Sequence, residues 1–132
     1  MTISYEFSPA DRLCVWTMSG QLTVDAMLDG VLAAQSDPRW SNEYDFLTLF
    51  TDASLAKVTP DDACALVDSL ATLDTPRADG GRKRSGIVCS DEMAAALLVY
   101  YEVQSDSQRT NRTRYFRTER EARAWLASPR ED

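Results

Sequence analysis

The chain has 132 residues, 44% of them hydrophobic, and a formal net charge of −7 with no histidine. This length favours one domain, spanning 1–132, with a sizeable core, and the negative charge disfavours nucleic acid as a partner. The missing histidine removes the side chain that most often carries acid–base or metal chemistry near neutral pH. No segment has the pattern of a signal peptide or a membrane span, so we expect a cytoplasmic protein without membrane insertion.

Strand and helix signals alternate along the whole sequence. The strand at 3–7 shows apolar residues at every second position, whereas 13–18 is apolar on both faces and is expected to be more central. The helices begin at capping residues followed by apolar positions three and four apart. In chain order, the pattern predicts strands at 3–7 and 13–18, a helix after Thr23, a strand at 46–50, a helix after Thr59, a strand at 86–89, a helix at 91–103, a strand at 112–116 and a helix after Thr118.

The remaining segments are expected to be loops. Residues 51–58 separate a strand from a helix, and 105–110 form a polar break. The stretch 74–84 contains Pro76 and a glycine pair, and its basic run at 82–84 is expected to be solvated. Residues 129–132 are expected to fray.

This order, β-β-α-β-α-β-α-β-α, predicts an α/β fold with a single mixed, mostly parallel sheet and crossover helices. The first two strands are expected to form an antiparallel hairpin, which places the first strand at an edge of the sheet.

The closing run Tyr115-Phe116-Arg117-Thr118-Glu119-Arg120-Glu121-Ala122-Arg123-Ala124-Trp125-Leu126 resembles the SpoIIAA-like branch of the STAS fold. The turns at 19–23 and 37–40 are similar to that family as well. The resemblance implies a domain that acts by binding a partner. It also implies a phosphorylated serine in an Asp-Ser-Ser-Gly-like motif, but the matching region 51–62 lacks that motif. Thr59 lies nearest the phosphoacceptor position, and Asp61 and Asp62 follow it.

Cysteines and acidic pairs indicate no metal site or cofactor. Cys14, Cys64 and Cys89 are far apart and each lies in an apolar element, so we expect three reduced core thiols. Acidic pairs such as Asp61 with Asp62 fall in first turns of helices, where they stabilise the helix dipole.

The predicted helix at 91–103 carries two apolar stripes. One stripe contains Ala94, Leu97, Leu98 and Tyr101, and the other contains Ala96, Val99, Tyr100 and Val103. A sheet face covers only one stripe, so the second must meet a neighbouring helix, a second subunit, a partner protein or an apolar ligand.

A second candidate site lies in the loop after the strand at 46–50. Ligands of parallel α/β sheets gather at the carboxyl ends of the strands, where Asp52, Ser54 and Thr59 are expected. The alternative is a solvated loop beside a capped helix.

Three functions remain open. The leading hypothesis is a non-enzymatic regulatory or protein-interaction module of STAS type, acting through a homodimer or partner interface on the helix at 91–103. The second is a small carrier or sensor of an apolar ligand. The third is an enzyme that uses Asp52 or Cys89, and the absence of a histidine base argues against it.

Overall fold

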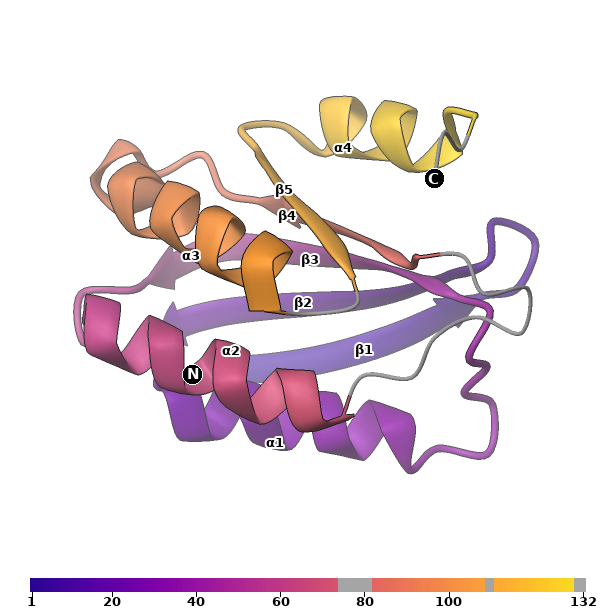
Figure 1. Cartoon of the computed structure of the whole chain (residues 1–132), viewed down its shortest axis with the longest axis horizontal. Helices are drawn as coiled ribbons and strands as arrows, with labels where there is room; N and C mark the ends of the chain where they lie inside the picture. Colours follow the sequence, from indigo (N-terminus) through magenta and orange to yellow (C-terminus); the bar gives the residue numbers. More distant parts are fainter. Residues whose placement is uncertain (74–81, 109–110, 130–132) are drawn as a thin grey trace.

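The fold is known from a computed structural model, which describes residues 1–73, 82–108 and 111–129. Five strands form one sheet in the order β1-β2-β3-β4-β5. β1 and β2 pair antiparallel, and the other neighbours pair parallel. The mixed, mostly parallel sheet with an antiparallel edge strand is therefore confirmed (Figure 1).

The elements follow the predicted alternation. The strands are β1 (Thr2–Ser8), β2 (Leu13–Gln21), β3 (Asp45–Ser54), β4 (Arg84–Val88) and β5 (Arg112–Phe116). The helices are α1 (Val24–Gln35), α2 (Pro60–Leu73), the 3₁₀ turn η1 (Glu92–Ala94), α3 (Ala95–Gln108) and α4 (Glu119–Ala127).

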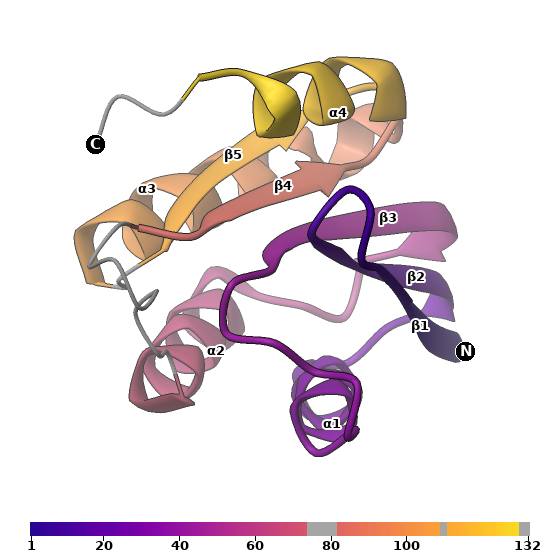
Figure 2. The same ribbon diagram turned by 90° about the vertical axis from the view of Figure 1, so that its right-hand side faces the viewer.

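Two layers of helix enclose the sheet. α1, α2 and α3 lie on one face and α4 on the other, as Figures 1 and 2 show. The main core lies beneath α1–α3 and includes Trp16, Phe46 and Leu98. A smaller core around Leu47, Val88 and Ala122 lies beneath α4.

The predicted caps of the helices are present. Thr59 and Asp62 form a reciprocal capping box, in which the Asp62 amide donates to Thr59 Oγ1 at 3.1 Å and the Thr59 amide donates to Asp62 Oδ2 at 3.0 Å. Thr118 caps α4 by accepting from the Glu121 amide at 3.3 Å. Its hydroxyl also donates to the Glu121 carboxylate at 2.8 Å, so Glu121 does not complete a reciprocal box by accepting from the Thr118 amide.

The basic run at 82–84 is not a solvated loop, and that prediction is wrong for the two residues that follow Arg82. Lys83 and Arg84 are buried, with only 3% and 4% of their surface exposed. The Lys83 ammonium lies 5.8 Å from the centroid of the Trp40 ring, which packs against the main core. The rest of the predicted loop, 74–81, lies outside the described residues.

The predicted break at 105–110 is also wrong as far as Gln108, because α3 continues to that residue. Ser105 is fully buried and its Oγ lies 2.8 Å from Thr113 Oγ1. The Asp106 carboxylate accepts from the Thr113 amide at 2.9 Å, and Glu102 accepts from the Tyr115 amide. The polar residues therefore bind strand β5 and protect its free edge from other strands. Residues 109–110 lie outside the described part of the chain.

Two smaller expectations also differ. Cys14 and Cys89 are buried, but Cys64 is only half-buried, so the expected trio of core thiols is a pair. Burial raises the pKa of the Cys14 thiol to about 12.

The first residue of the tail expected to fray is held in place, because the Pro129 carbonyl accepts a hydrogen bond from Arg84 at 2.8 Å. The rest of that tail, 130–132, lies outside the described residues.

Candidate functional site

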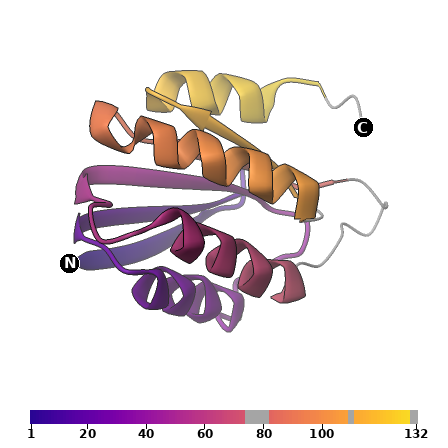
Figure 3. The same cartoon turned by 60° about the vertical axis from the view of Figure 1, so that its left-hand side comes forward.

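A groove of about 790 Å³ lies where β3 and β4 end and where α2 and α3 begin. Figure 3 shows this region, with α2 and α3 side by side in front of the sheet. Most of the residues that line the groove are apolar, and Ser54 and Asp91 are polar exceptions. The full lining is Ser54, Leu55, Ala56, Val58, Pro60, Asp91, Ala94, Ala96, Leu97 and Tyr100.

The loop side of the groove is held in shape by local hydrogen bonds. Ser54 Oγ accepts from the Ala56 amide at 3.2 Å, and the Val58 amide donates to the Leu55 carbonyl at 2.9 Å. This compact turn buries Leu55 and Val58 against the core. The adjacent first turn of α2 is fixed by its capping box, so this wall is preformed.

The helix side of the groove comes from η1 and the first turns of α3. Ala94 and Leu98 are buried, and Leu97 packs against the same core, which confirms that the first stripe faces inward. The second stripe remains exposed: Val99 keeps 49% and Val103 keeps 58% of its surface in contact with solvent. These are unusual values for valines on a helix that packs against a sheet.

Tyr100 joins the two walls. Its Oη lies 3.0 Å from Cys64 Sγ on α2, so the neighbouring helix does meet part of the second stripe. The Cys64 contact, burial and the nearby Asp61 charge together raise the pKa of the Tyr100 phenol. The phenol is therefore neutral at pH 7 and offers the groove a hydrogen-bonding group.

The groove is apolar at its base and has charged side chains of both signs beside it. Asp91 lines it, and Glu92 beside it is paired with Arg117 at 3.2 Å. Asp61 lies close enough to influence Tyr100. Lys57 is exposed in the loop wall of the groove, so a cation also lies among these acidic groups.

The structure brings together three of the seven predicted site residues. Ser54, Ala96 and Tyr100 line the same groove, although the sequence placed them in two separate candidate sites. Val99 and Val103 lie on the exposed face of α3 outside this lining.

The other two predicted residues have local structural roles. Thr59 is exposed and its hydroxyl caps α2. Asp52 lies within β3, which runs to Ser54 and is longer than predicted. Its φ of 48° falls where the β2–β3 register shifts, so Asp52 occupies the left-handed position of a bulge. Asp tolerates this conformation better than most residues.

The groove contains residues that the sequence did not single out. Leu55, Val58 and Pro60 belong to the loop and helix start, and Leu97 was assigned to the inner stripe alone. The available signal was the pair of apolar residues Leu55 and Val58 in a short loop. A fully solvated loop would expose both side chains, so their presence indicated that part of the loop packs against the protein.

The catalytic alternatives find little support in this geometry. Cys89 is 3% exposed and does not line the groove, and Asp52 is exposed at the bulge. Among the residues that the structure describes, no cluster of three or more Cys, Asp or Glu side chains has the arrangement of a metal site. None of the described helices combines the length and apolar character needed to cross a bilayer.

Comparisons with known proteins agree with the fold. The architecture defines a small α/β domain with an N-terminal hairpin. No family model and no curated protein matches the sequence. The structure is similar to the crystal structure of an uncharacterised protein of the DUF3478 family, with a SpoIIAA-like fold, from Shewanella loihica PV-4. The two share 19% identity over 96% of this chain and 93% of that one, with a TM-score of 0.54. The fold of this chain is SpoIIAA-like, as the sequence resemblance implied.

Proposed function

We propose that this protein is a non-enzymatic regulatory module of STAS type that binds another protein at the groove between the β3–α2 loop and α3. The observation that carries the proposal is an apolar groove that continues into an exposed apolar stripe. Tyr100 lines the groove, and Val99 and Val103 extend the apolar surface along α3. Exposed apolar surfaces of this kind mark interaction sites more often than catalytic ones.

The chemistry of the groove favours a basic, amphipathic partner segment. Aliphatic and aromatic anchors fit its apolar base, and Asp61 on the first turn of α2 favours Lys or Arg at its edge. A second copy of the chain would bring the acidic groups of two identical surfaces together, which costs binding energy. A heterologous partner therefore fits this surface better than the homodimer does.

A cytoplasmic location is part of the proposal, because the three free cysteines suit a reducing compartment. A second candidate function, a carrier or sensor of an apolar ligand, is favoured by a different feature. An internal cavity lies on the other side of Val58 and Leu97, the two side chains that also line the groove.

The partner preference is testable with displayed random peptides selected on the wild-type protein. We expect the enriched peptides to combine apolar anchors with Lys or Arg. Ala96→Arg places a bulky cation in the groove and should weaken their binding at least about tenfold, which corresponds to ~1.4 kcal/mol.

Ala124→Arg is the matched control, because Ala124 is an exposed alanine on α4 across the sheet. This variant should bind the peptides as the wild type does. Equal binding by Ala96→Arg, or enriched peptides without the apolar and basic pattern, would refute the groove as the interface. Sedimentation of the same variants tests the homodimer: a wild-type dimer that Ala96→Arg dissociates identifies the partner as a second copy.

A further inference from the structure

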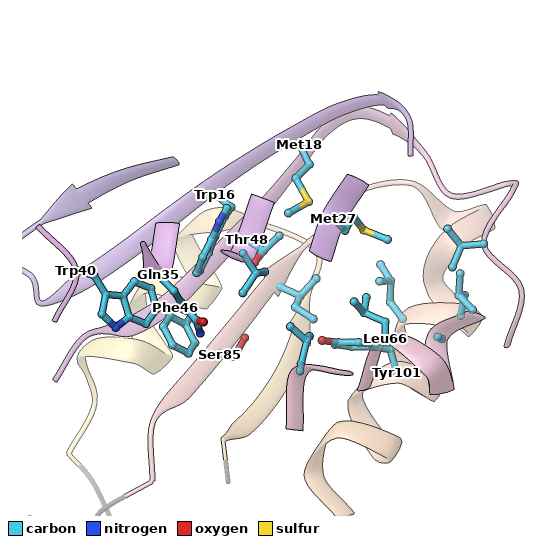
Figure 4. A pocket seen from close by; sticks show the side chains of 17 residues that line it. Trp16, Met18, Met27, Gln35, Trp40, Phe46, Thr48, Leu66, Ser85 and Tyr101 are labelled. Carbon is cyan, nitrogen blue, oxygen red and sulfur yellow. The ribbon is translucent and has the colours of Figure 1, made fainter. Parts of the chain in front are cut away.

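A second, interior cavity of about 100 Å³ lies between the sheet and helices α1, α2 and α3. Figure 4 shows that its two ends differ in chemistry. Trp40, Phe46, Gln35 and Ser85 lie at one end. Met18, Met27, Leu66 and Tyr101 lie at the other, so the first end is mainly aromatic and the second is mainly aliphatic beside the Tyr101 ring.

Aromatic rings form a wall of the first end. The Trp40 and Phe46 rings are stacked with centroids 5.6 Å apart, and Trp16 meets Phe46 edge-on at 5.5 Å. Both indole N–H groups are already used: Trp16 donates to the Gly30 carbonyl at 3.1 Å and Trp40 to Asn42 Oδ1 at 3.0 Å. These indoles therefore offer the cavity apolar ring surface and no free donor, while the Lys83 ammonium lies over the Trp40 and Phe46 rings.

Ser85 is the most buried of the three small or amide polar residues of the lining, which also includes Gln35 and Thr48. Only 7% of the surface of Ser85 is exposed. Its hydroxyl makes no hydrogen bond to another described residue, but its oxygen is not one of the fully buried atoms without a partner, which among the described residues are Arg84 Nε and Asn111 Nδ2. The hydroxyl is therefore accessible from the cavity, where a ligand or a water can form a hydrogen bond with it.

The lining excludes a charged occupant. Among the described residues, the 17 that border the cavity include no acidic or basic side chain. A charge placed there would lose its hydration, and the Lys83 ammonium, 5.6 Å from the centroid of the Phe46 ring, lies outside the lining. The lining therefore favours a neutral occupant.

We propose that this cavity binds a small neutral molecule with a single aromatic ring and one hydroxyl-type polar group, which hydrogen-bonds to Ser85. The ring lies against Trp16, Trp40 and Phe46. A dry cavity of ~150 Å³ is known to accept benzene, so this cavity must expand modestly. Met18 and Met27 provide that room, because unbranched thioether side chains repack at low cost.

The test uses 4-fluorophenol and fluorobenzene, which differ by the hydroxyl alone, in ¹⁹F NMR titrations of the full chain. We expect saturable binding of both probes. Ser85→Ala should weaken 4-fluorophenol by roughly 2- to 12-fold, the factor equivalent to one hydrogen bond of ~0.5–1.5 kcal/mol. The same variant should change the affinity for fluorobenzene by less than about twofold, because it removes no apolar contact.

A second variant tests the location. Ala63 lines the cavity and is buried, so Ala63→Leu should fill the space and abolish binding of both probes. Ala124→Leu, at an exposed position on α4, is the matched control and should leave both titrations unchanged. The Ser85→Ala comparison remains decisive if Ala63→Leu does not fold.

Three results would overturn the proposal: no saturable binding of either probe, which means that the cavity holds water only; equal weakening of both probes by Ser85→Ala; or unchanged binding in folded Ala63→Leu. None of these results bears on the groove, since Ser85 and Ala63 do not line it.

Discussion

Arg84 fixes the end of α4 to the sheet, and its removal should destabilise the protein measurably. Its guanidinium Nη1 donates to the Trp125 carbonyl at 2.7 Å and to the Ser128 carbonyl and Oγ at 3.0 and 2.9 Å. Nη2 donates to the Pro129 carbonyl at 2.8 Å, and the guanidinium carbon lies 5.3 Å from the centroid of the Trp125 ring. One side chain thus satisfies several carbonyls that the helix end leaves without partners.

The expected cost follows from these contacts. A hydrogen bond that involves a charged group contributes ~1.5–3 kcal/mol, but the bonds to Arg84 do not add fully. Ser128 is half-buried and Pro129 exposed, so water replaces part of what Arg84→Ala removes. We therefore expect Arg84→Ala to lower the free energy of unfolding by about 3 kcal/mol, including the lost packing on Trp125. For 132 residues this lowers Tm by roughly 10 °C.

Urea unfolding followed by tryptophan fluorescence and circular dichroism measures this cost. Arg84→Lys should fall between the wild type and Arg84→Ala, because it retains the charge and loses the planar fork. Arg120→Ala is the control: this exposed arginine on α4 should change stability by less than about 0.5 kcal/mol. An Arg84→Ala protein within 1 kcal/mol of the wild type would show that the guanidinium does not hold α4, and the reasoning would fail.

Two further predictions concern other buried polar contacts. Glu102→Ala leaves the Tyr115 amide at the free edge of β5 without its carboxylate, so we expect a loss of about 1–3 kcal/mol in urea unfolding and faster aggregation by light scattering. Unchanged values for both would contradict the edge-protection role. The Arg39 side chain, with further bonds from the Arg39 amide and Tyr5, holds the pKa of Asp37 well below its usual range. A carboxyl whose pKa is lowered on folding stabilises the protein above its unfolded pKa of ~3.9 and loses that contribution as pH falls further. Asp37→Asn should therefore be less stable than the wild type at pH 7, with a smaller difference at pH 3, and a difference that grows on acidification would contradict this assignment.

The order of elements was predictable because local signals and tertiary structure agree along most of the chain. Thr59 with Asp62, and Thr118 with the Glu121 amide, form caps that their spacing predicts, and each begins a helix where expected. The apolar alternation of β1 and the near-continuous apolar run of β3 assign them to an edge and to the interior of the sheet. The parallel pairing follows from the strand–helix alternation alone.

Segments whose polar residues bind distant partners were not predictable. A run of basic residues is usually solvated, so the sequence predicts solvent exposure for Lys83 and Arg84. Their partners, the Trp40 ring and the end of α4, are far away in sequence. Ser105 and Asp106 likewise read as a break, although they bond to Thr113 in the following strand. In each case a contact with a residue distant in sequence buries or orders a polar segment that, by its local sequence alone, would be an exposed loop.

The candidate site was predictable in its parts and not in its assembly. Periodicity identified the exposed stripe of α3, and the rule on carboxyl ends of parallel strands identified the loop after β3. Nothing in the sequence measures the distance between Ser54 and Tyr100, so their shared groove required the structure. Asp52 was misleading because a bulge, which only strand pairing reveals, explains its position.

The groove and the interior cavity are separated by the same two side chains, Val58 and Leu97. A ligand that fills the cavity presses on them from inside, and a partner contacts them from outside. If both proposals hold, occupancy of one space changes the packing of the other, and the effect must be reciprocal: the factor by which ligand changes peptide affinity equals the factor by which peptide changes ligand affinity. Ser85 borders only the cavity and Ala96 only the groove, so their variants separate direct loss of binding from coupling through the shared wall.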